Sequence, residues 1–233
     1  MLRSLLSCIL LFCTSSCAVQ RPARSVPTPK ANEVSFLALG DSYTIGEGVG
    51  AAERWPVQLA ALARQQGQPV QAPTIIARTG WTTAELQAAV AEAHAQKTYG
   101  LVSLQIGVNN QYRGQTVGLY RTEFRALLRT AVGFAGGRSG RVLVLSIPDW
   151  GQSPFARRQG RDPAAIGAEI NRFNTVAQQE CQQAGVAYID ITPLTRTAAG
   201  DAAAFTRDGL HYAGPHLRQW AQQALPVVQG LLK

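Results

Sequence analysis

The sequence has little of several features that would place it in other protein classes. Of its four cysteines only Cys181 lies beyond residue 17, which excludes an intramolecular disulfide and a cysteine-based metal site from there on. Charged residues make up only 15% of the 233 residues. No run of 18 or more apolar residues occurs, which excludes a membrane-spanning helix. With 46% hydrophobic residues and ordinary proline and glycine contents, the sequence predicts one globular domain rather than a disordered chain.

Acidic residues are absent before Glu33, so the net charge of +8 owes much to the beginning of the chain. From Glu33 on, 18 basic residues stand against 14 acidic ones, and the only tight basic cluster is Arg157, Arg158 and Arg161. Domains that bind nucleic acid show a clustered basic face, often with interleaved aromatic residues. No such patch is visible, so we expect a mildly basic surface and no nucleic-acid partner.

Residues 1–17 have the plan of an export signal. A short positive start is followed by a mostly apolar run at residues 5–12, and small residues then lead to Cys17. The segment is too short to span a membrane. Small residues directly before a cysteine resemble the cleavage site of bacterial lipoproteins, in which that cysteine is lipidated, although Thr14 stands where leucine is usual. Ordinary signal cleavage near Ala18 is the alternative.

Residues 18–32 contain three prolines and three cations, a composition that cannot build a core but can space a domain from a membrane. The predicted organisation is therefore an export signal (1–17), a Pro-rich tether (18–32) and a folded domain (33–233). The predicted location is the bacterial cell envelope, either periplasmic or lipid-anchored, with secretion as the second possibility. A lipid on Cys17 is the only membrane contact that we expect.

From residue 33 onward, short apolar and β-branched runs alternate with longer segments of helical spacing. The runs that predict strands are 34–39, 74–77, 101–106, 142–147 and 186–189. Apolar residues spaced i, i+3, i+4, i+7 predict helices within 117–131 and 166–184, with a weaker, Ala-rich helix at 86–93. A last helix is predicted at 217–224, and Pro226 is expected to kink or end it.

Five strands that alternate with helices imply a parallel sheet covered on both faces. Right-handed crossovers then give a three-layer α/β/α sandwich. Cys181 falls on the apolar face of the helix within 166–184, so we expect it to be a buried small hydrophobe. Binding sites of such sheets form at the carboxyl ends of the strands. Residues that directly follow predicted strands are therefore the candidates for chemistry.

A nucleophile and a base follow the first and the last predicted strand. Ser42 comes directly after the first strand and Gly40-Asp41, where a tight turn can present its hydroxyl. A hydroxyl is a weak nucleophile at neutral pH and needs a base. After the fifth strand, Asp208 and His211 are three residues apart, a spacing that can place the carboxylate against the imidazole and fix its tautomer.

Two potential hydrogen-bond donors follow the strands between them. Gly80 comes after the second strand, where the absence of a side chain lets the backbone N–H point outward. Asn109 comes after the third strand and offers a neutral amide donor. Each feature alone is more typical of a turn or a helix cap. Nucleophile, base, orienting carboxylate and donors at the ends of four strands together predict an active site.

Other patterns favour simpler interpretations or stay open. Residues 46–51 resemble a dinucleotide-binding turn, but they do not directly follow a strand and no acidic residue lies about 20 positions on. His216 lacks carboxylate or cysteine neighbours at a metal-ligand spacing. Trp81, Trp150 and Phe155 follow strand ends, and they either line a substrate pocket or pack in the core.

These motifs and their order resemble the SGNH hydrolases, also called GDSL-type esterases and lipases. The four residues that name the family match Ser42, Gly80, Asn109 and His211, within the strings Gly40-Asp41-Ser42-Tyr43-Thr44 and Asp208-Gly209-Leu210-His211. The resemblance covers nearly all of the chain after Glu33. Two positions depart from the family pattern. Tyr43 stands in place of leucine, and Asn110 stands where aspartate is frequent, which leaves the packing of that loop open.

The resemblance implies a flavodoxin-like fold and a carboxylic ester hydrolase that works through an acyl-enzyme. It implies that Ser42 attacks the ester carbonyl, that His211 takes and returns the proton, and that Asp208 orients His211. The backbone N–H groups of Ser42 and Gly80 and the amide of Asn109 would hold the oxyanion. It implies no metal and no organic cofactor.

The resemblance leaves the substrate open, because this scaffold serves many esters. Short-acyl esters or lysophospholipid-like esters are the first expectation, and O-acetyl groups on glycans are the second. The partner is therefore expected to be a small-molecule, lipid or glycan ester. A non-catalytic envelope lipoprotein that uses the same fold for binding is the alternative from a different class. The complete set of Ser42, His211 and Asp208 argues against it, since a protein without catalysis is free to lose them.

Overall fold

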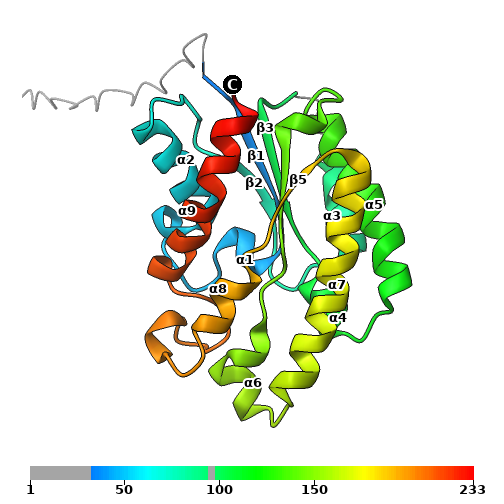
Figure 1. The fold of residues 1–233 in the computed structure, drawn as a ribbon, viewed down its shortest axis with the longest axis vertical. Coiled ribbons are helices and arrows are strands. Elements are labelled where there is room, and N and C mark those ends of the chain that lie inside the picture. Colours follow the sequence, from blue (N-terminus) through cyan, green and yellow to red (C-terminus); the bar gives the residue numbers. More distant parts are fainter. Residues whose placement is uncertain (1–32, 94–97) are drawn as a thin grey trace, which may run out of the picture. The chain divides into compact units, whose positions relative to one another are not determined.

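The computed structural model describes residues 33–93 and 98–233 (Figure 1). The predicted export signal at 1–17, the tether at 18–32 and the lipidation candidate Cys17 lie outside the described residues and remain predictions. Among the helices of the described ranges, none is long and apolar enough to cross a membrane.

In the described part of the chain, five strands form a parallel sheet with the order β2-β1-β3-β4-β5. They are β1 (Phe36–Gly40), β2 (Thr74–Ala77), β3 (Leu101–Gln105), β4 (Val142–Leu145) and β5 (Ala187–Ile189). Each predicted strand is confirmed, with ends that differ by no more than two residues. Every residue of β1, β3 and β4 is buried. Burial on both faces explains why these strands read as nearly continuous apolar runs.

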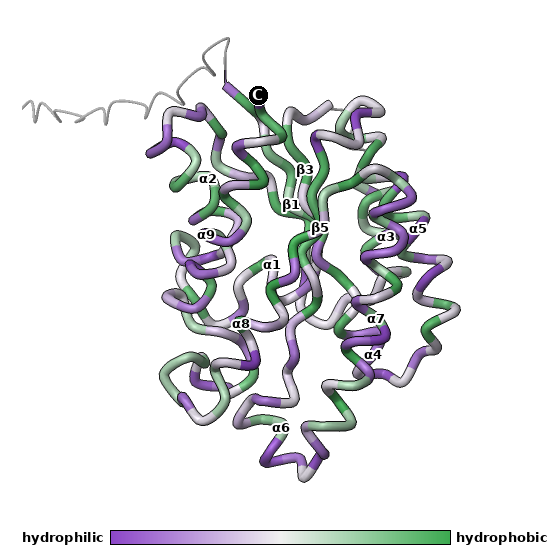
Figure 2. Tube along the Cα trace, viewed as in Figure 1, coloured by the Kyte–Doolittle hydropathy of each residue, from purple (hydrophilic) through white to green (hydrophobic). Residues whose placement is uncertain are grey.

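Helices cover both faces of this sheet (Figure 1). They are α1 (Ser42–Ile45), α2 (Trp55–Gln65), α3 (Thr83–Glu92), α4 (Val108–Tyr112), α5 (Val117–Phe134), α6 (Pro154–Arg158), α7 (Pro163–Ala184), α8 (Thr192–Thr197) and α9 (Gly214–Leu231). α2 and α9 pack together on one face, and α3, α5 and α7 pack on the other. Figure 2 shows hydrophobic residues along the strands between these layers. The α/β/α sandwich with its flavodoxin-like strand order is therefore confirmed.

The four predicted helices are confirmed as α3, α5, α7 and α9. Cys181 is fully buried on α7, as predicted. Its burial, together with the nearby charge of Glu180, raises the pKa of the thiol to about 12. Sequence reasoning missed α2, because alanines blur its 3.6-residue apolar pattern. Pro56 in the first turn of α2 was the available signal, since proline is typical of helix starts.

α9 continues through Pro226 to Leu231, so the alternative that this proline ends the helix is wrong. A proline inside a helix removes one backbone hydrogen bond. Trp220, Ala224 and Val228 nevertheless form one buried stripe that crosses the position of the proline. The packing of this stripe, mainly against α2, holds the helix together across the missing bond.

The end of β1 is tightly packed around Gly40. A Cβ atom at this position would lie 2.5 Å from the carbonyl oxygen of Gln105 on β3 and would also overlap the hydroxyl of Thr44 on α1. Because only glycine leaves this space empty, α1 can fold back against the sheet directly after the strand. This turn places Ser42 at the carboxyl edge of the sheet.

We expect Gly40→Ala to destabilise the protein, because the added methyl group must push β3 and α1 apart. Overpacking of this kind typically costs about 1–3 kcal/mol, so Tm should fall by several degrees in a thermal unfolding curve. Gly118→Ala is the matched control, since a Cβ at Gly118 on α5 would meet no atom within 4 Å. An unchanged Tm for Gly40→Ala would show that this close contact does not constrain the turn.

Candidate active site

Ser42 is the first residue of α1 and follows the buried strand β1 after one intervening residue. That residue, Asp41, caps the helix: its Oδ1 accepts the Tyr43 N–H at 3.0 Å. α1 ends after four residues at Gly46, which has a left-handed conformation. Among the described residues, no hydrogen bond engages the Ser42 N–H. The turn therefore leaves both the hydroxyl and the N–H of Ser42 available at the mouth of a pocket.

Gly80 lies in the loop between β2 and α3 with a φ of +86°. This left-handed backbone conformation favours glycine. Lack of space does not require glycine here, because the nearest atom to an added Cβ would be 3.8 Å away on Arg113. The carbonyl of Gly80 accepts a hydrogen bond of 2.6 Å from the Arg113 guanidinium. Within the described ranges its N–H has no hydrogen-bond partner. Gly80 thus offers a second free backbone donor.

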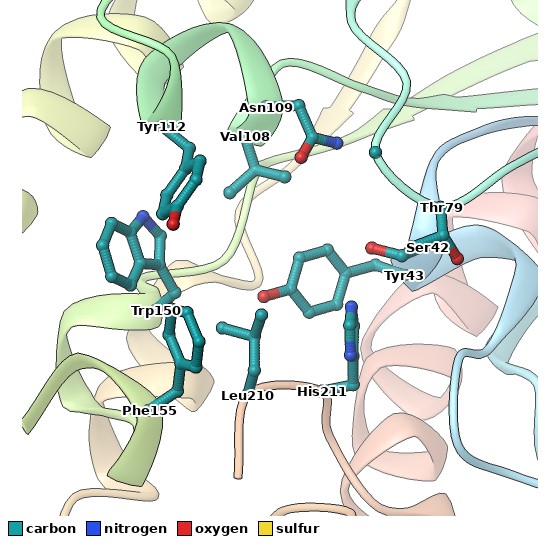
Figure 3. Close-up of a pocket in the computed structure, with 11 residues that line it drawn as sticks. Ser42, Tyr43, Thr79, Val108, Asn109, Tyr112, Trp150, Phe155, Leu210 and His211 are labelled. Carbon is teal, nitrogen blue, oxygen red and sulfur yellow. The ribbon is translucent and has the colours of Figure 1, made fainter. Parts of the chain in front are cut away.

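Asn109 lies in the first turn of α4, and its side chain lines the same pocket (Figure 3). Its Nδ2 donates to the carbonyl of Trp81 at 2.9 Å. An amide nitrogen carries two hydrogens, so one remains for a ligand. Asn109 and Arg113 together tie α4 to the loop that carries Gly80. Two of the predicted donors are therefore held relative to each other.

Asn110, where the resembled family often has aspartate, is fully buried and well bonded. Its Oδ1 accepts the backbone N–H of Thr83 at 3.1 Å, and its Nδ2 donates to the Thr83 hydroxyl at 2.6 Å and to Gln115 at 2.7 Å. Glu123 lies 3.5 Å from the same Nδ2. The two hydrogens of Nδ2 already go to Thr83 and Gln115, but an uncharged amide can lie this close to the Glu123 carboxylate, whereas an aspartate would repel it. Asn110 therefore fits its surroundings, and the loop after β3 packs without disturbance.

Asp208 and His211 form a carboxylate–imidazole pair at the site. Asp208 Oδ2 lies 2.6 Å from His211 Nδ1. The other oxygen of Asp208 accepts the N–H groups of Leu210 and His211 at 2.7 and 3.0 Å and the Thr206 hydroxyl at 2.9 Å. Partial burial raises the pKa of Asp208, but these hydrogen bonds outweigh it and lower the pKa to about 2. Asp208 is therefore a carboxylate at neutral pH, which favours the proton on Nδ1 of His211 and leaves Nε2 able to accept a hydrogen bond.

Asp41 has the opposite environment although it is next to Ser42. Its side chain is buried, and its Oδ2 has no hydrogen-bond partner in the described part of the chain. Burial raises the pKa of Asp41 to about 7, against the lowering effect of the Tyr43 N–H and of its own N–H. Two carboxyl groups near one serine thus have pKa values shifted in opposite directions. Asp208, the one that is ionised at neutral pH, is the one in contact with the histidine.

The sequence suggested that the loop of Asp208 and His211 directly follows β5. In the structure, α8 lies between β5 and this loop. The loop reaches the site through a short antiparallel bridge between Phe205 and Tyr212. Figure 3 shows a ring nitrogen of His211 directed toward the Ser42 hydroxyl. No hydrogen bond joins these two side chains among the described residues. Catalytic contacts are often long in the absence of substrate.

All four residues that name the resembled family line one pocket of about 190 Å³. Its walls are otherwise mostly apolar or aromatic: Tyr43, Thr79, Val108, Tyr112, Trp150, Phe155 and Leu210. The sequence left open whether Trp150 and Phe155 line a substrate pocket or pack in the core, and both line the pocket. Trp150 is held there by a 2.8 Å hydrogen bond to Gln111. Trp81 does not line it and contributes its backbone carbonyl to Asn109.

Several of these lining residues were not predicted from the sequence to be at the pocket. Tyr43, Val108 and Leu210 are each adjacent in sequence to a predicted site residue, and this adjacency was the available signal. Tyr112 gave no such signal, since it reaches the pocket from the last residue of α4. In residues 33–93 and 98–233, no cluster of three or more His, Cys, Asp or Glu side chains is arranged to hold a metal ion.

Solved structures share this fold. The crystal structure of TesA matches with a TM-score of 0.67 and 19% identity, over 85% of this chain and 99% of that one. A lipase/acylhydrolase from Enterococcus faecalis matches with a TM-score of 0.66 and 21% identity, over 86% and 97%. Axe2, an acetylxylan esterase from Geobacillus stearothermophilus, matches with a TM-score of 0.66 and 15% identity, over 84% and 94%. No curated protein matches the sequence.

A family comparison adds the sequence pattern to this likeness of fold. The model of the GDSL-like lipase/acylhydrolase family matches residues 38–214, a range that includes Ser42, Gly80, Asn109, Asp208 and His211. This match covers most of the chain and contains every residue of the candidate site. The chain therefore belongs to the GDSL-like lipase/acylhydrolase family and is a carboxylic ester hydrolase.

Proposed function

We propose that the protein is a serine esterase that hydrolyses short-acyl or lysophospholipid-like esters through an acyl-enzyme on Ser42. One observation carries the proposal: Ser42 and His211 line one pocket, and His211 Nδ1 lies 2.6 Å from the ionised Asp208. A hydroxyl becomes a useful nucleophile only beside such an oriented base. The pocket supplies that base together with space for an ester.

In the first half of the reaction, the Ser42 Oγ attacks the ester carbonyl carbon while His211 Nε2 takes the hydroxyl proton. The carbon–oxygen bond to the alcohol then breaks, and His211 returns the proton to the departing alcohol. In the second half, a water molecule attacks the acyl-enzyme and gives its proton to His211, which passes it to Ser42 as the acid leaves. Asp208 stays ionised throughout and supports the positive charge on His211.

The negative charge that develops on the carbonyl oxygen needs donors that are already in place. Among the residues that the structure describes, the N–H groups of Ser42 and Gly80 have no hydrogen-bond partner, and Asn109 has one amide hydrogen beyond its bond to Trp81. These three groups belong to residues that line the same pocket. We assign them to the oxyanion hole, because preorganised donors of this kind stabilise the tetrahedral intermediate.

A specific observation favours carbohydrate O-acetyl groups as a second candidate substrate. Tyr112, Trp150 and Phe155 bring three aromatic rings to one pocket. Aromatic rings offer a flat apolar surface with polar edges, and such a surface also suits a sugar ring. Axe2, a fold neighbour, is an acetylxylan esterase.

Hydrolysis of a nitrophenyl ester series from acetyl to palmitoyl, by the protein and by Ser42→Ala, tests the proposed function. Removing the nucleophile should lower kcat by about 10³-fold or more, and a fluorophosphonate should label only the serine protein. A maximum at short chains supports small acyl substrates, whereas a maximum at long chains supports lipids. A folded protein with neither hydrolysis nor labelling would instead be a binding module.

Asn109→Ala should keep the fold and lower kcat by about 10²–10³-fold, since it removes one oxyanion donor. KM should change less, because the donor acts mainly in the transition state. Thermal unfolding, measured in parallel, reports any loss of the hydrogen bond to Trp81. A change in kcat below about threefold would show that Asn109 is not an oxyanion donor.

We also propose that the protein is exported to the bacterial cell envelope and lipidated on Cys17. The apolar run and the small residues before Cys17 support this proposal. Bacteria that express the full chain should incorporate radiolabelled palmitate into it, and Cys17→Ser should abolish the label. An unlabelled full chain in the periplasm or the medium would favour ordinary signal cleavage.

A further inference from the structure

Tyr43 is a polar side chain that the proposed reaction does not use. It follows Ser42 directly and is only 3% exposed. Its ring packs against His211, Tyr212 and Trp220, with centroids 5.3, 6.0 and 6.0 Å away. Figure 3 shows its hydroxyl pointing into the pocket, toward the end where Leu210 and Trp150 lie.

The hydroxyl of Tyr43 makes no hydrogen bond to any residue in the described ranges. Burial raises the pKa of this phenol well above its usual range, so the group stays protonated and can donate. A buried hydroxyl without a partner is unfavourable. When the pocket is empty, water can reach the group and satisfy it, but a substrate that fills the pocket displaces that water.

The surroundings of the hydroxyl determine which substrate would satisfy it. Val108, Trp150, Phe155 and Leu210 form mostly apolar walls, which suit a neutral group better than a charged one. A plain alkyl chain would fill this space and leave the Tyr43 hydroxyl unpaired. A chain with an oxygen atom at the right position would accept its hydrogen bond. Leucine, which the family pattern has at this position, could not make that distinction.

We propose that Tyr43 is a specificity-determining residue, whose hydroxyl selects esters that carry a neutral oxygen, as ether, hydroxyl or carbonyl, in the group that fills the pocket. This inference rests on the proposed esterase function. Sites that hydrogen-bond one group of a substrate discriminate against analogues that lack it. Ester selection would then be set on the same turn that carries the nucleophile.

Ester pairs of equal size test the inference on the full chain. On the acyl side they are nitrophenyl methoxyacetate and butyrate, 3-methoxypropionate and pentanoate, and 4-methoxybutyrate and hexanoate. On the alcohol side they are 2-methoxyethyl acetate and butyl acetate. For each pair, kcat/KM for the oxygen-containing ester is divided by that for the alkyl ester. The same ratio in Tyr43→Phe serves as reference, because the intrinsic effect of the oxygen on reactivity is equal for both proteins.

For at least one pair, we expect this ratio of kcat/KM values to be at least about threefold higher in the protein than in Tyr43→Phe. A difference of this size corresponds to one net hydrogen bond. Phenylalanine keeps the ring contacts with His211 and Trp220, so the variant should fold. Tyr112→Phe is the matched control, because it makes the same change in the same pocket at a side chain that is 47% exposed. Its ratios should match those of the protein.

Three results would overturn the inference. Equal ratios in the protein and Tyr43→Phe for every pair, with kcat/KM itself unchanged for each ester, would show that the hydroxyl meets no substrate atom. A loss in Tyr43→Phe that is the same for both members of each pair would place the hydroxyl at the reacting atoms instead. A shift of the same size in Tyr112→Phe would remove the assignment to Tyr43. Failure to hydrolyse any ester would overturn the proposed function as well, whereas unchanged ratios with normal hydrolysis would overturn this inference alone.

Discussion

All five strands run in the same direction, and the position of the active site depends on this constraint. In a parallel sheet the carboxyl ends of the strands meet at one edge. The order β2-β1-β3 places β1 between its two neighbours, so Ser42, after β1, lies between the loop of Gly80 after β2 and the loop of Asn109 after β3. The proposed nucleophile and the proposed oxyanion donors therefore become neighbours through strand order, although 67 positions separate Ser42 from Asn109.

Strand order brings the loops near one another, and hydrogen bonds from side chains then fix their relative positions. Asn109 and Arg113 bond to successive carbonyls of the Gly80 loop, so α4 and that loop move together. Asp208 plays a similar part on the other side of the pocket. Its carboxylate accepts two backbone N–H groups of its own loop and also contacts His211. One charged group thus holds the shape of the loop and orients the base.

The parts of this structure that the sequence predicts are those determined by local pattern. The fully buried strands β1, β3 and β4 require continuous apolar runs, and the partly buried strands β2 and β5 are also rich in apolar residues, so all five strands of the described residues could be located. Motifs after strands could then be assigned to one edge. α2 was missed, because its helix depends on packing against α9 more than on a strong pattern. The pocket walls could be predicted only in part, since Trp150 and Phe155 were candidates but Tyr112 was not. Tyr112 and Trp150 approach each other, with ring centroids 5.3 Å apart, only because α4 and the segment after β4 meet in the folded chain.

Catalysis and selectivity place different demands on this fold. The proposed catalytic groups depend on backbone features, such as the close packing at Gly40 and the positive φ of Gly80, which favour glycine. The pocket walls consist of side chains that differ in exposure: Trp150 is buried and bonded to Gln111, whereas Tyr112 is 47% exposed. Solved structures with 11–21% identity share this fold, which by itself does not specify the substrate. Family membership specifies the reaction, and the side chains around the serine specify the ester.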